Sequence, residues 1–380
     1  MQVLLRARHR WLFDAPTDLA IAWCWVPFFV AAHLFTIRTG TAADLSVQRL
    51  LTWVLLASLL HQPLTLLLVY GDRHQFAQRR RLFVLAPLVA VVLIGVAVQL
   101  DLWVIVPIAA VWQNVHTLQQ RYGLLRIYAR KAGYGGQRLD RAVLFVPFVA
   151  VLALVALLPI TAAQVARFGG LLDADTASEV GLLSDARPAL TALLVPLGVA
   201  TVAVLVRYLR QERAAVADGQ ANPAKWSYLG SVLLLTASLP VDPVAGLIAI
   251  IASHAIEYGI VVMRTLRSRY GARPERTSLL SRLAGTTPRR WMLLAVFLGA
   301  FWLLDDRMRD VLPWHTYLIA LYTVGLLHFV YDAIIWKVRR PAVASGFGIP
   351  AQRTDQPPGS TGMSRTSRSN VDDAGVHSIR

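Results

Sequence analysis

Long apolar segments recur along the chain, and most of them are nearly free of charge and long enough to cross a lipid bilayer. The interior of a bilayer offers no water to the backbone, so a spanning segment must satisfy its own N–H and C=O groups, which favours helices. The composition agrees, since 56% of the 380 residues are hydrophobic. We therefore expect an all-α, polytopic membrane protein with ten spans, at roughly residues 18–37, 50–70, 82–99, 102–118, 142–163, 188–207, 227–241, 243–263, 291–304 and 316–336.

Basic residues are divided unequally between the two sets of connecting loops. If the N-terminus is cytoplasmic, 32 of the 38 Lys and Arg residues lie on the cytoplasmic side. The six on the outer side are Arg38, Arg49, Arg167, Arg187, Arg307 and Arg309. The excess of positive charge on one side predicts that both termini are cytoplasmic and that the chain is a multi-pass protein of the plasma (inner) membrane.

The formal net charge of +16 follows mainly from these flanking residues. They border membrane spans instead of forming one recognition face, so nucleic acid is not an expected partner. Membrane lipids with anionic headgroups are the expected neighbours of the basic turns.

The sequence predicts one large domain followed by a tail. Residues 1–340 form the transmembrane helical domain, and residues 341–380 are rich in Ser, Thr, Gly, Pro and Arg without apolar periodicity. Such a tail is expected to be a disordered cytoplasmic segment. The single cysteine, Cys24, lies in the first span, which excludes an intrachain disulfide and a cysteine-based metal cluster.

Four histidines lie within predicted spans that all run from the outer to the inner side: His61, His116, His254 and His328. At a rise of about 1.5 Å per residue, His254 and His328 lie roughly 14 Å from their cytoplasmic edges. His61 lies at a similar depth, and His116 is shallower. Each histidine taken alone is explained by a hydrogen bond to a neighbouring helix. Because ionisable side chains are costly in hydrocarbon, four at related depths indicate a shared functional site.

Three of the four histidines have a polar partner one helical turn away. Gln120 follows His116 and Asp332 follows His328 at i+4, while Glu257 follows His254 at i+3, so each pair shares one helix face. Nitrogen and oxygen ligands without sulfur favour iron, manganese or zinc, and paired histidines and carboxylates hold di-metal sites in helix bundles. The predicted metal ligands are His61, His116, His254, His328, Glu257 and Asp332.

Further residues are expected to serve the same site. Glu257, Asp332 and Tyr258 are the predicted catalytic residues, with Tyr258 as a proton donor. Four other residues are expected to orient or cover the ligands: Asp72, His74, Asn114 and Gln120. Two histidines nearer the outer side, His33 and His315, are expected to be structural.

Several motifs are missing from the sequence, and their absence narrows the function. The chain has no phosphate-binding loop and no His-Glu-x-x-His motif, which argues against ATP-driven work and against a zincin protease. The intramembrane histidines near the cytoplasmic side resemble, at the level of class, those of integral-membrane non-haem iron oxygenases, desaturases and carotenoid-cleaving enzymes. The tight His-x-x-His-His clusters of fatty-acid desaturases are absent, so no residue roles follow from the resemblance.

The first functional hypothesis is a membrane-bound, metal-dependent oxidoreductase. A mono- or di-iron site would use dioxygen to hydroxylate, desaturate or cleave a lipid-soluble substrate, with electrons from a cytosolic reductase. A second hypothesis uses the same histidines in a proton-coupled transporter without a cofactor or in a haem-binding electron carrier. A third is a membrane lipid transferase that needs only His116 or His254.

Overall fold

The structure is a computed structural model that describes residues 10–100, 102, 105–168, 176–270, 279–336 and 347. Within these residues every regular element is a helix, which confirms the all-α prediction. The helices are α2 (Ala15–Trp23), α3 (Trp25–Thr36), α4 (Thr41–His61), α5 (Pro63–Tyr70), α6 (Arg73–Gln78), α7 (Arg80–Gln99), α8 (Ile105–Ala132), α9 (Gln137–Leu157), α10 (Pro159–Phe168), α11 (Thr176–Ala217), α12 (Pro223–Ser238), α13 (Pro243–Tyr270), α14 (Leu279–Leu283), α15 (Thr287–Val311) and α16 (Trp314–Ile335). The predicted disordered tail, 341–380, lies outside the described residues except for Phe347.

Seven stretches of described helix are long and apolar enough to cross a membrane. They are Ala15–Thr36, Thr41–Tyr70, Arg80–Gln99, Gln137–Leu157, Ser184–Ala217, Pro243–Tyr270 and Trp314–Ile335. The other three predicted spans fall on α8, α12 and α15. These segments are helical, but they are not both long and apolar enough to count among the seven. α12 has only 16 residues, and α8 and α15 both end in charged turns.

Local sequence signals explain several helix ends. Asp14 caps α2 by accepting from the backbone N–H of Thr17, and Asn222 caps α12 by accepting from that of Ala224. Pro63 lacks an N–H and interrupts the backbone ladder between α4 and α5. The break leaves His61 as the last residue of α4.

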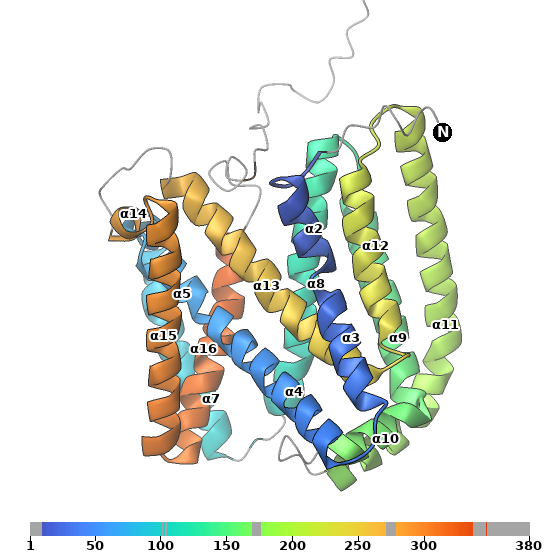
Figure 1. Cartoon of the computed structure of the whole chain (residues 1–380), viewed down its shortest axis with the longest axis horizontal. Coiled ribbons are helices and arrows are strands. Elements are labelled where there is room, and N and C mark those ends of the chain that lie inside the picture. The colour runs from blue at the N-terminus through green and yellow to red at the C-terminus, as the bar shows by residue number, and fades with distance from the viewer. Residues whose placement is uncertain are drawn as a thin grey trace, which may run out of the picture.

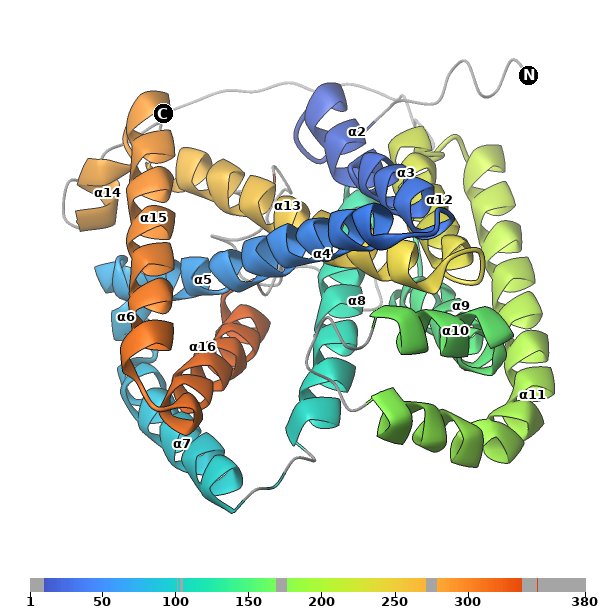
Figure 2. The ribbon, with the colours of Figure 1, turned by 60° about the horizontal axis from the view of Figure 1, so that its bottom comes forward.

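Helix α13 runs obliquely through the middle of the bundle (Figures 1 and 2). It packs against α3 and α4, and it is the most buried of the seven candidate spans. On one side of it α16 packs against α5 and α7, and on the other α9 packs against α11. His254, in the central part of α13, is therefore surrounded by protein on all sides, with an exposure of 0%.

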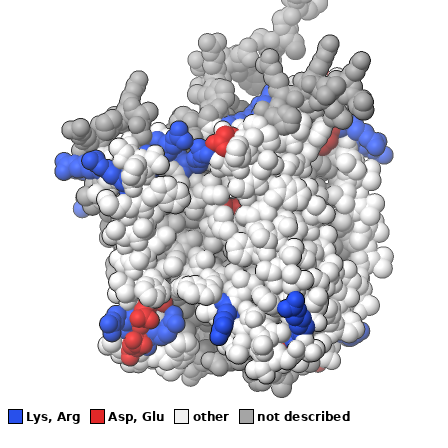
Figure 3. All heavy atoms as spheres, in the orientation of Figure 1, with Lys and Arg blue, Asp and Glu red and all other residues white. Residues whose placement is uncertain are grey.

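The outer surface of the bundle is apolar. On α11, Val195, Val199 and Val202 are more than 60% exposed, and on α7 Leu88 and Val92 are exposed to a similar extent. Figure 3 shows a belt of uncharged residues around the visible face, with Lys and Arg concentrated towards its two ends. An apolar surface of this extent indicates a lipid environment.

Candidate metal centre

The four histidines that the sequence predicts to lie in membrane spans converge on one point, although each comes from a different helix. The ring centroid of His61 lies 4.8 Å from that of His254 and 4.9 Å from that of His328. The ring of His116 lies 5.3 Å from His254 and 4.8 Å from His328. The four imidazoles thus form a closed cluster in which each ring contacts two others.

Two groups within this cluster have ligand atoms close enough together to bind a metal ion. One consists of His61, His254 and His328, and the other of His116, His328 and Asp332, with all ligand atoms of each group within 4.8 Å of one another. His328 belongs to both. The geometry therefore allows either one ion or two ions that share the region around His328.

The distances in the second group suit a metal ion. Nε2 of His328 lies 3.1 Å from Nε2 of His116, and Oδ2 of Asp332 lies 3.7 Å and 3.8 Å from these two nitrogens. Two nitrogens bound to the same ion at about 2.0–2.1 Å lie about 3–3.4 Å apart. A direct hydrogen bond also explains the contact between His116 and His328, so this pair alone does not require a metal.

The other two histidines give the stronger evidence. Both ring nitrogens of His61 and both of His254 are buried without a hydrogen-bond partner. The ring of His61 approaches the backbone carbonyls of Ala57 and Ser58 on its own helix, but it does not reach hydrogen-bond geometry. Unsatisfied buried polar atoms are rare and costly, and an ion or water bound between them is a common explanation. Each ring can give one nitrogen to an ion, so a metal bound between His61 and His254 would provide a partner for one nitrogen of each.

Thr65 on α5 connects the cluster to Asp332. Its hydroxyl donates to Oδ1 of Asp332 at 2.8 Å, and its oxygen lies 2.8 Å from Nδ1 of His328. Since the hydroxyl hydrogen is directed to the carboxylate, the oxygen accepts from Nδ1–H. This tautomer leaves Nε2 of His328 with a free lone pair that faces the centre of the cluster.

The two oxygens of Asp332 have different surroundings. Oδ1 accepts hydrogen bonds from Thr65, from the Tyr258 hydroxyl at 2.9 Å and from the Trp336 indole at 3.1 Å. Oδ2 instead faces Nε2 of His116 and of His328. Three donors thus hold the carboxylate so that its second oxygen is directed at the imidazoles, as expected of a metal ligand.

Thr65 and Trp336 were not among the site residues predicted from the sequence. A signal was present for Trp336, because it follows Asp332 by four residues at the end of α16, which places the two side chains on one face. Thr65 also follows His61 by four residues, but the break at Pro63 puts the two residues on different helices. Tyr258, a predicted catalytic residue, lies at the cluster, with its ring centroid 5.3 Å from that of His61 and 5.2 Å from that of His328.

Glu257 lies in a different environment from the one predicted. Its carboxylate is 3.5 Å from Nε of Arg121 and accepts a hydrogen bond of 3.2 Å from Gln120. Arg121 also donates to Ser253 at 2.7 Å and is 2% exposed. Glu257 belongs to neither of the two groups of ligand atoms. The structure therefore places it in a buried ion pair next to the cluster.

Of the four residues predicted to orient or cover the ligands, some lie beside the histidine cluster and others lie away from it. Gln120 bonds to the carbonyl of His254 as well as to Glu257, so it lies beside the cluster. Asp72 caps α6 by accepting from the backbone N–H groups of His74 and Gln75, and it also accepts a hydrogen bond from Tyr270. His74 is exposed on α6. Asp72 and His74 are therefore not part of the histidine cluster. Asn114 is half-buried on α8, two residues before His116.

The two histidines predicted to be structural lie elsewhere. His315 is exposed at the start of α16. His33 bonds to Asp242 at 2.9 Å, and Asp242 also accepts from Thr36, from Gln164 and from the backbone of Ala245. Although it lies in the turn between α12 and α13, Asp242 is only 1% exposed, and these four groups surround its carboxylate.

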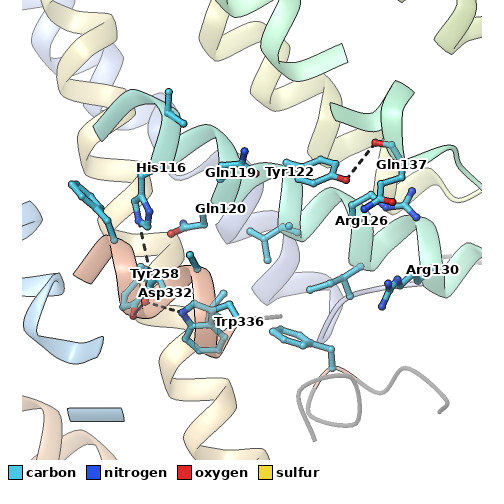
Figure 4. A pocket seen from close by; sticks show the side chains of 18 of the residues that line it. His116, Gln119, Gln120, Tyr122, Arg126, Arg130, Gln137, Tyr258, Asp332 and Trp336 are labelled. Atoms are coloured by element: carbon cyan, nitrogen blue, oxygen red, sulfur yellow. Dashed lines mark hydrogen bonds and ion pairs between the residues drawn. The ribbon is translucent and has the colours of Figure 1, made fainter. Parts of the chain in front are cut away.

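A cavity of about 540 Å³ opens beside the cluster and extends along α8 (Figure 4). His116, Tyr258 and Asp332 line one end, and Arg126 and Arg130 line the other. Apolar side chains from α8, α13 and α16 form the walls between these ends. A site for a small molecule usually has this form, a largely apolar cavity with a few polar groups at fixed points.

Searches of protein-family models, of curated proteins and of solved structures found no match to this chain. The function is therefore argued from the geometry of the cluster and the cavity.

Proposed function

We propose that this protein is an integral-membrane, metal-dependent oxidoreductase that acts on a lipid-soluble substrate in the cavity beside the histidine cluster. The observation that carries this proposal is the pair of buried imidazoles of His61 and His254, whose ring nitrogens have no hydrogen-bond partner and each of which can offer one nitrogen to an ion. Next to them lie the imidazoles of His116 and His328 and one directed carboxylate oxygen of Asp332. Imidazole and carboxylate ligands without sulfur suit non-haem iron, as one ion or two.

The metal would supply the activation of dioxygen, and the protein would supply geometry and an environment with little water. The histidines hold the centre, and Thr65 fixes the tautomer of His328. Tyr258 donates to Asp332 and lies at the cavity end, so it is positioned to transfer a proton between the cavity and that carboxylate.

Hydroxylation of a carbon–hydrogen bond by this route consumes one dioxygen molecule, two electrons and two protons. One oxygen atom enters the new hydroxyl group, and the other leaves as water. The electrons require an external donor, for which a cytosolic reductase is the proposed partner. Desaturation of the substrate or its oxidative cleavage uses the same site with a different fate of the oxygen atoms.

We further propose ten membrane crossings with both termini cytoplasmic in the inner membrane. Figures 1 and 2 show α8, α12 and α15 lying among the seven apolar spans, and α8 carries one of the four histidines. The division of basic residues between the loops supports the orientation.

Two other functions would use the same residues. A haem held by two histidines needs room for the macrocycle between the two imidazole rings. Here the four rings contact one another edge to face or at steep angles. This packing argues against a haem. A proton-coupled transporter would use the hydrogen bonds between Tyr258, Asp332, Thr65 and His328 as a relay and would need no metal.

Metal analysis of the detergent-purified protein separates these functions. After growth with added iron, we expect about one or two transition-metal ions per chain, no Soret band, and loss of the metal in His254→Ala. Protein that folds normally but holds no stoichiometric metal would overturn the oxidoreductase and favour proton-coupled transport. Activity of the metal-free protein in sealed vesicles would then test the transporter directly.

A further inference from the structure

We infer that the cavity binds an uncharged lipid alcohol, whose hydroxyl group donates to the side-chain oxygen of Gln120 beside the histidine cluster. The carbons next to this hydroxyl then lie near His116, and the hydrocarbon chain leads to the outer surface of the bundle. That the alcohol is the substrate rests on the proposed function, whereas its binding does not.

The side-chain amide of Gln120 has a fixed orientation. Its Nε2 donates to Glu257 at 3.2 Å and to the backbone carbonyl of His254 at 3.4 Å. Because a backbone carbonyl can only accept, the amide nitrogen faces it and Oε1 faces elsewhere. Figure 4 shows this oxygen at the tip of the side chain, directed to the side on which His116 lies.

Oε1 of Gln120 is buried and has no hydrogen-bond partner among the residues that the structure describes, although Gln120 lines the cavity. Two donors of the lining, the Tyr258 hydroxyl and the Trp336 indole, both donate to Asp332 instead. A buried acceptor without a partner costs free energy, so a ligand that brings a donor to this point is favoured. A hydroxyl group is a donor that an uncharged lipid can carry.

The charged side chains that line the cavity already have partners. Oδ1 of Asp332 accepts from three donors, and its Oδ2 faces two imidazoles. Arg126 pairs with Asp140, and Arg130 has an interaction of its own. A charged ligand would lose its hydration without gaining an ion pair in this cavity, so the lining favours an uncharged ligand.

Apolar side chains border the histidine end of the cavity. The ring centroid of Phe329 lies 4.8 Å from that of His116, and both residues line the cavity. Trp112 and Val115 also line it and are 51% and 37% exposed at the outer surface of the bundle. A hydrocarbon chain can therefore extend from Gln120 past His116 to the lipid. The volume of about 540 Å³ is within the range for one small molecule.

The test measures competition for photo-labelling of the full chain in nanodiscs of zwitterionic lipid. The probe is hexadecanol with a diazirine group at its third carbon, and the competitors are 1-hexadecanol and 1-fluorohexadecane at known mole fractions in the bilayer. Fluorine is close in size to a hydroxyl group but carries no donor. We expect the alcohol to compete at a mole fraction about tenfold lower than the fluoride, because it pairs a buried acceptor. Hexadecyl sulfate, which is permanently anionic, should compete no better than the fluoride.

A pair of glutamine variants tests the position of the hydroxyl group. Gln120→Met removes the acceptor and should bring the ratio between alcohol and fluoride to about one. The variant also loses the bonds to Glu257 and His254, but a general loosening of the cavity weakens both competitors alike and leaves their ratio unchanged. Gln137→Met is the matched control and should keep the wild-type ratio, because the exposed Gln137 lines the end of the cavity remote from His116 (Figure 4).

Equal competition by the alcohol and the fluoride in the wild type would overturn the hydroxyl assignment, and this result needs no variant. An unchanged ratio in Gln120→Met, an equal change in Gln137→Met, or stronger competition by the sulfate than by the alcohol would also overturn it. Cross-links should fall on residues 112–123 of α8 or on Phe329, and cross-links confined to other helices would overturn the location.

Metal content is measured on the same samples. Selective binding of the alcohol without metal would refute the oxidoreductase alone. A metal-loaded protein that does not distinguish the alcohol from the fluoride would refute the alcohol site alone.

Discussion

Nε2 of His116 lies 3.1 Å from Nε2 of His328, although 212 positions separate these residues in the sequence. The contact joins α8 to α16 at the end of the cavity. His328 also belongs to the group formed with His61 and His254, so it connects the two sets of ligand atoms.

This shared position predicts an order of effects among histidine variants. His328→Ala should lose most of the bound metal because it removes a ligand from both groups. His61→Ala and His116→Ala each remove a ligand from one group and should retain more metal if two ions are bound. Elemental analysis of the purified variants measures this, with His315→Ala as the exposed-histidine control. Metal content equal to the control in all three variants would contradict the assignment.

The Thr65 hydroxyl should raise the metal affinity of the cluster, although it is not proposed as a metal ligand. Thr65→Val keeps the shape of the side chain but removes the acceptor for Nδ1–H of His328 and a donor to Asp332. Loss of such an orienting group lowers metal affinity by about 10–100-fold. Thr65→Ser retains the hydroxyl and should stay close to the wild type in a competitive chelator titration. Equal affinity of the Val and Ser variants would show that the tautomer is set by another group.

The buried pair of Arg121 and Glu257 should act on stability more than on metal binding. Glu257→Gln leaves the Arg121 charge buried without its partner, which costs about 3–5 kcal/mol in comparable pairs. We expect a lower unfolding temperature in detergent with the metal content retained. Replacement of both residues by Met should recover much of the lost stability. Loss of the metal in Glu257→Gln at unchanged stability would instead support Glu257 as a ligand.

Asp242, between α12 and α13, should make stability depend on pH. Burial raises the pKa of its carboxyl, but hydrogen bonds from Thr36, Ala245, His33 and Gln164 outweigh this effect and hold the pKa below its usual range. A lowered pKa in the folded state stabilises the protein above the unfolded value of about 3.9, and this contribution is lost as the pH falls through the folded pKa. Asp242→Asn should thus lower the unfolding temperature at pH 7, and the difference from the wild type should shrink below about pH 4. A constant difference over this range would contradict the argument.

The proposed orientation can be tested with a single introduced cysteine. Cys24→Ser removes the one native thiol, and cysteine is then placed at Arg138 or at Val311, both of which are exposed. A membrane-impermeant thiol reagent added to intact cells should label position 311 and not position 138, and it should label both after the cells are opened. The reverse pattern would invert the topology.

The residue sequence by itself indicated an all-helical chain with several helices apolar enough to cross a membrane, and it predicted related depths for the four histidines. Both are local properties, because the length of an apolar segment and the rise per residue need no knowledge of neighbouring helices. The spacing of His328 and Asp332 also placed both side chains on one helix face, where the structure has them.

The tertiary structure decided which faces meet. Glu257 has the same kind of spacing from His254 as Asp332 has from His328, yet it pairs with Arg121 because α8 presents that guanidinium to it. Thr65 comes into contact with His328 and Asp332 only through the packing of α5 against α16. The burial of Asp242 likewise depends on donors from α3 and α10. The order of helices around the bundle, and the cavity beside α8, follow from contacts between helices, which no single helix encodes.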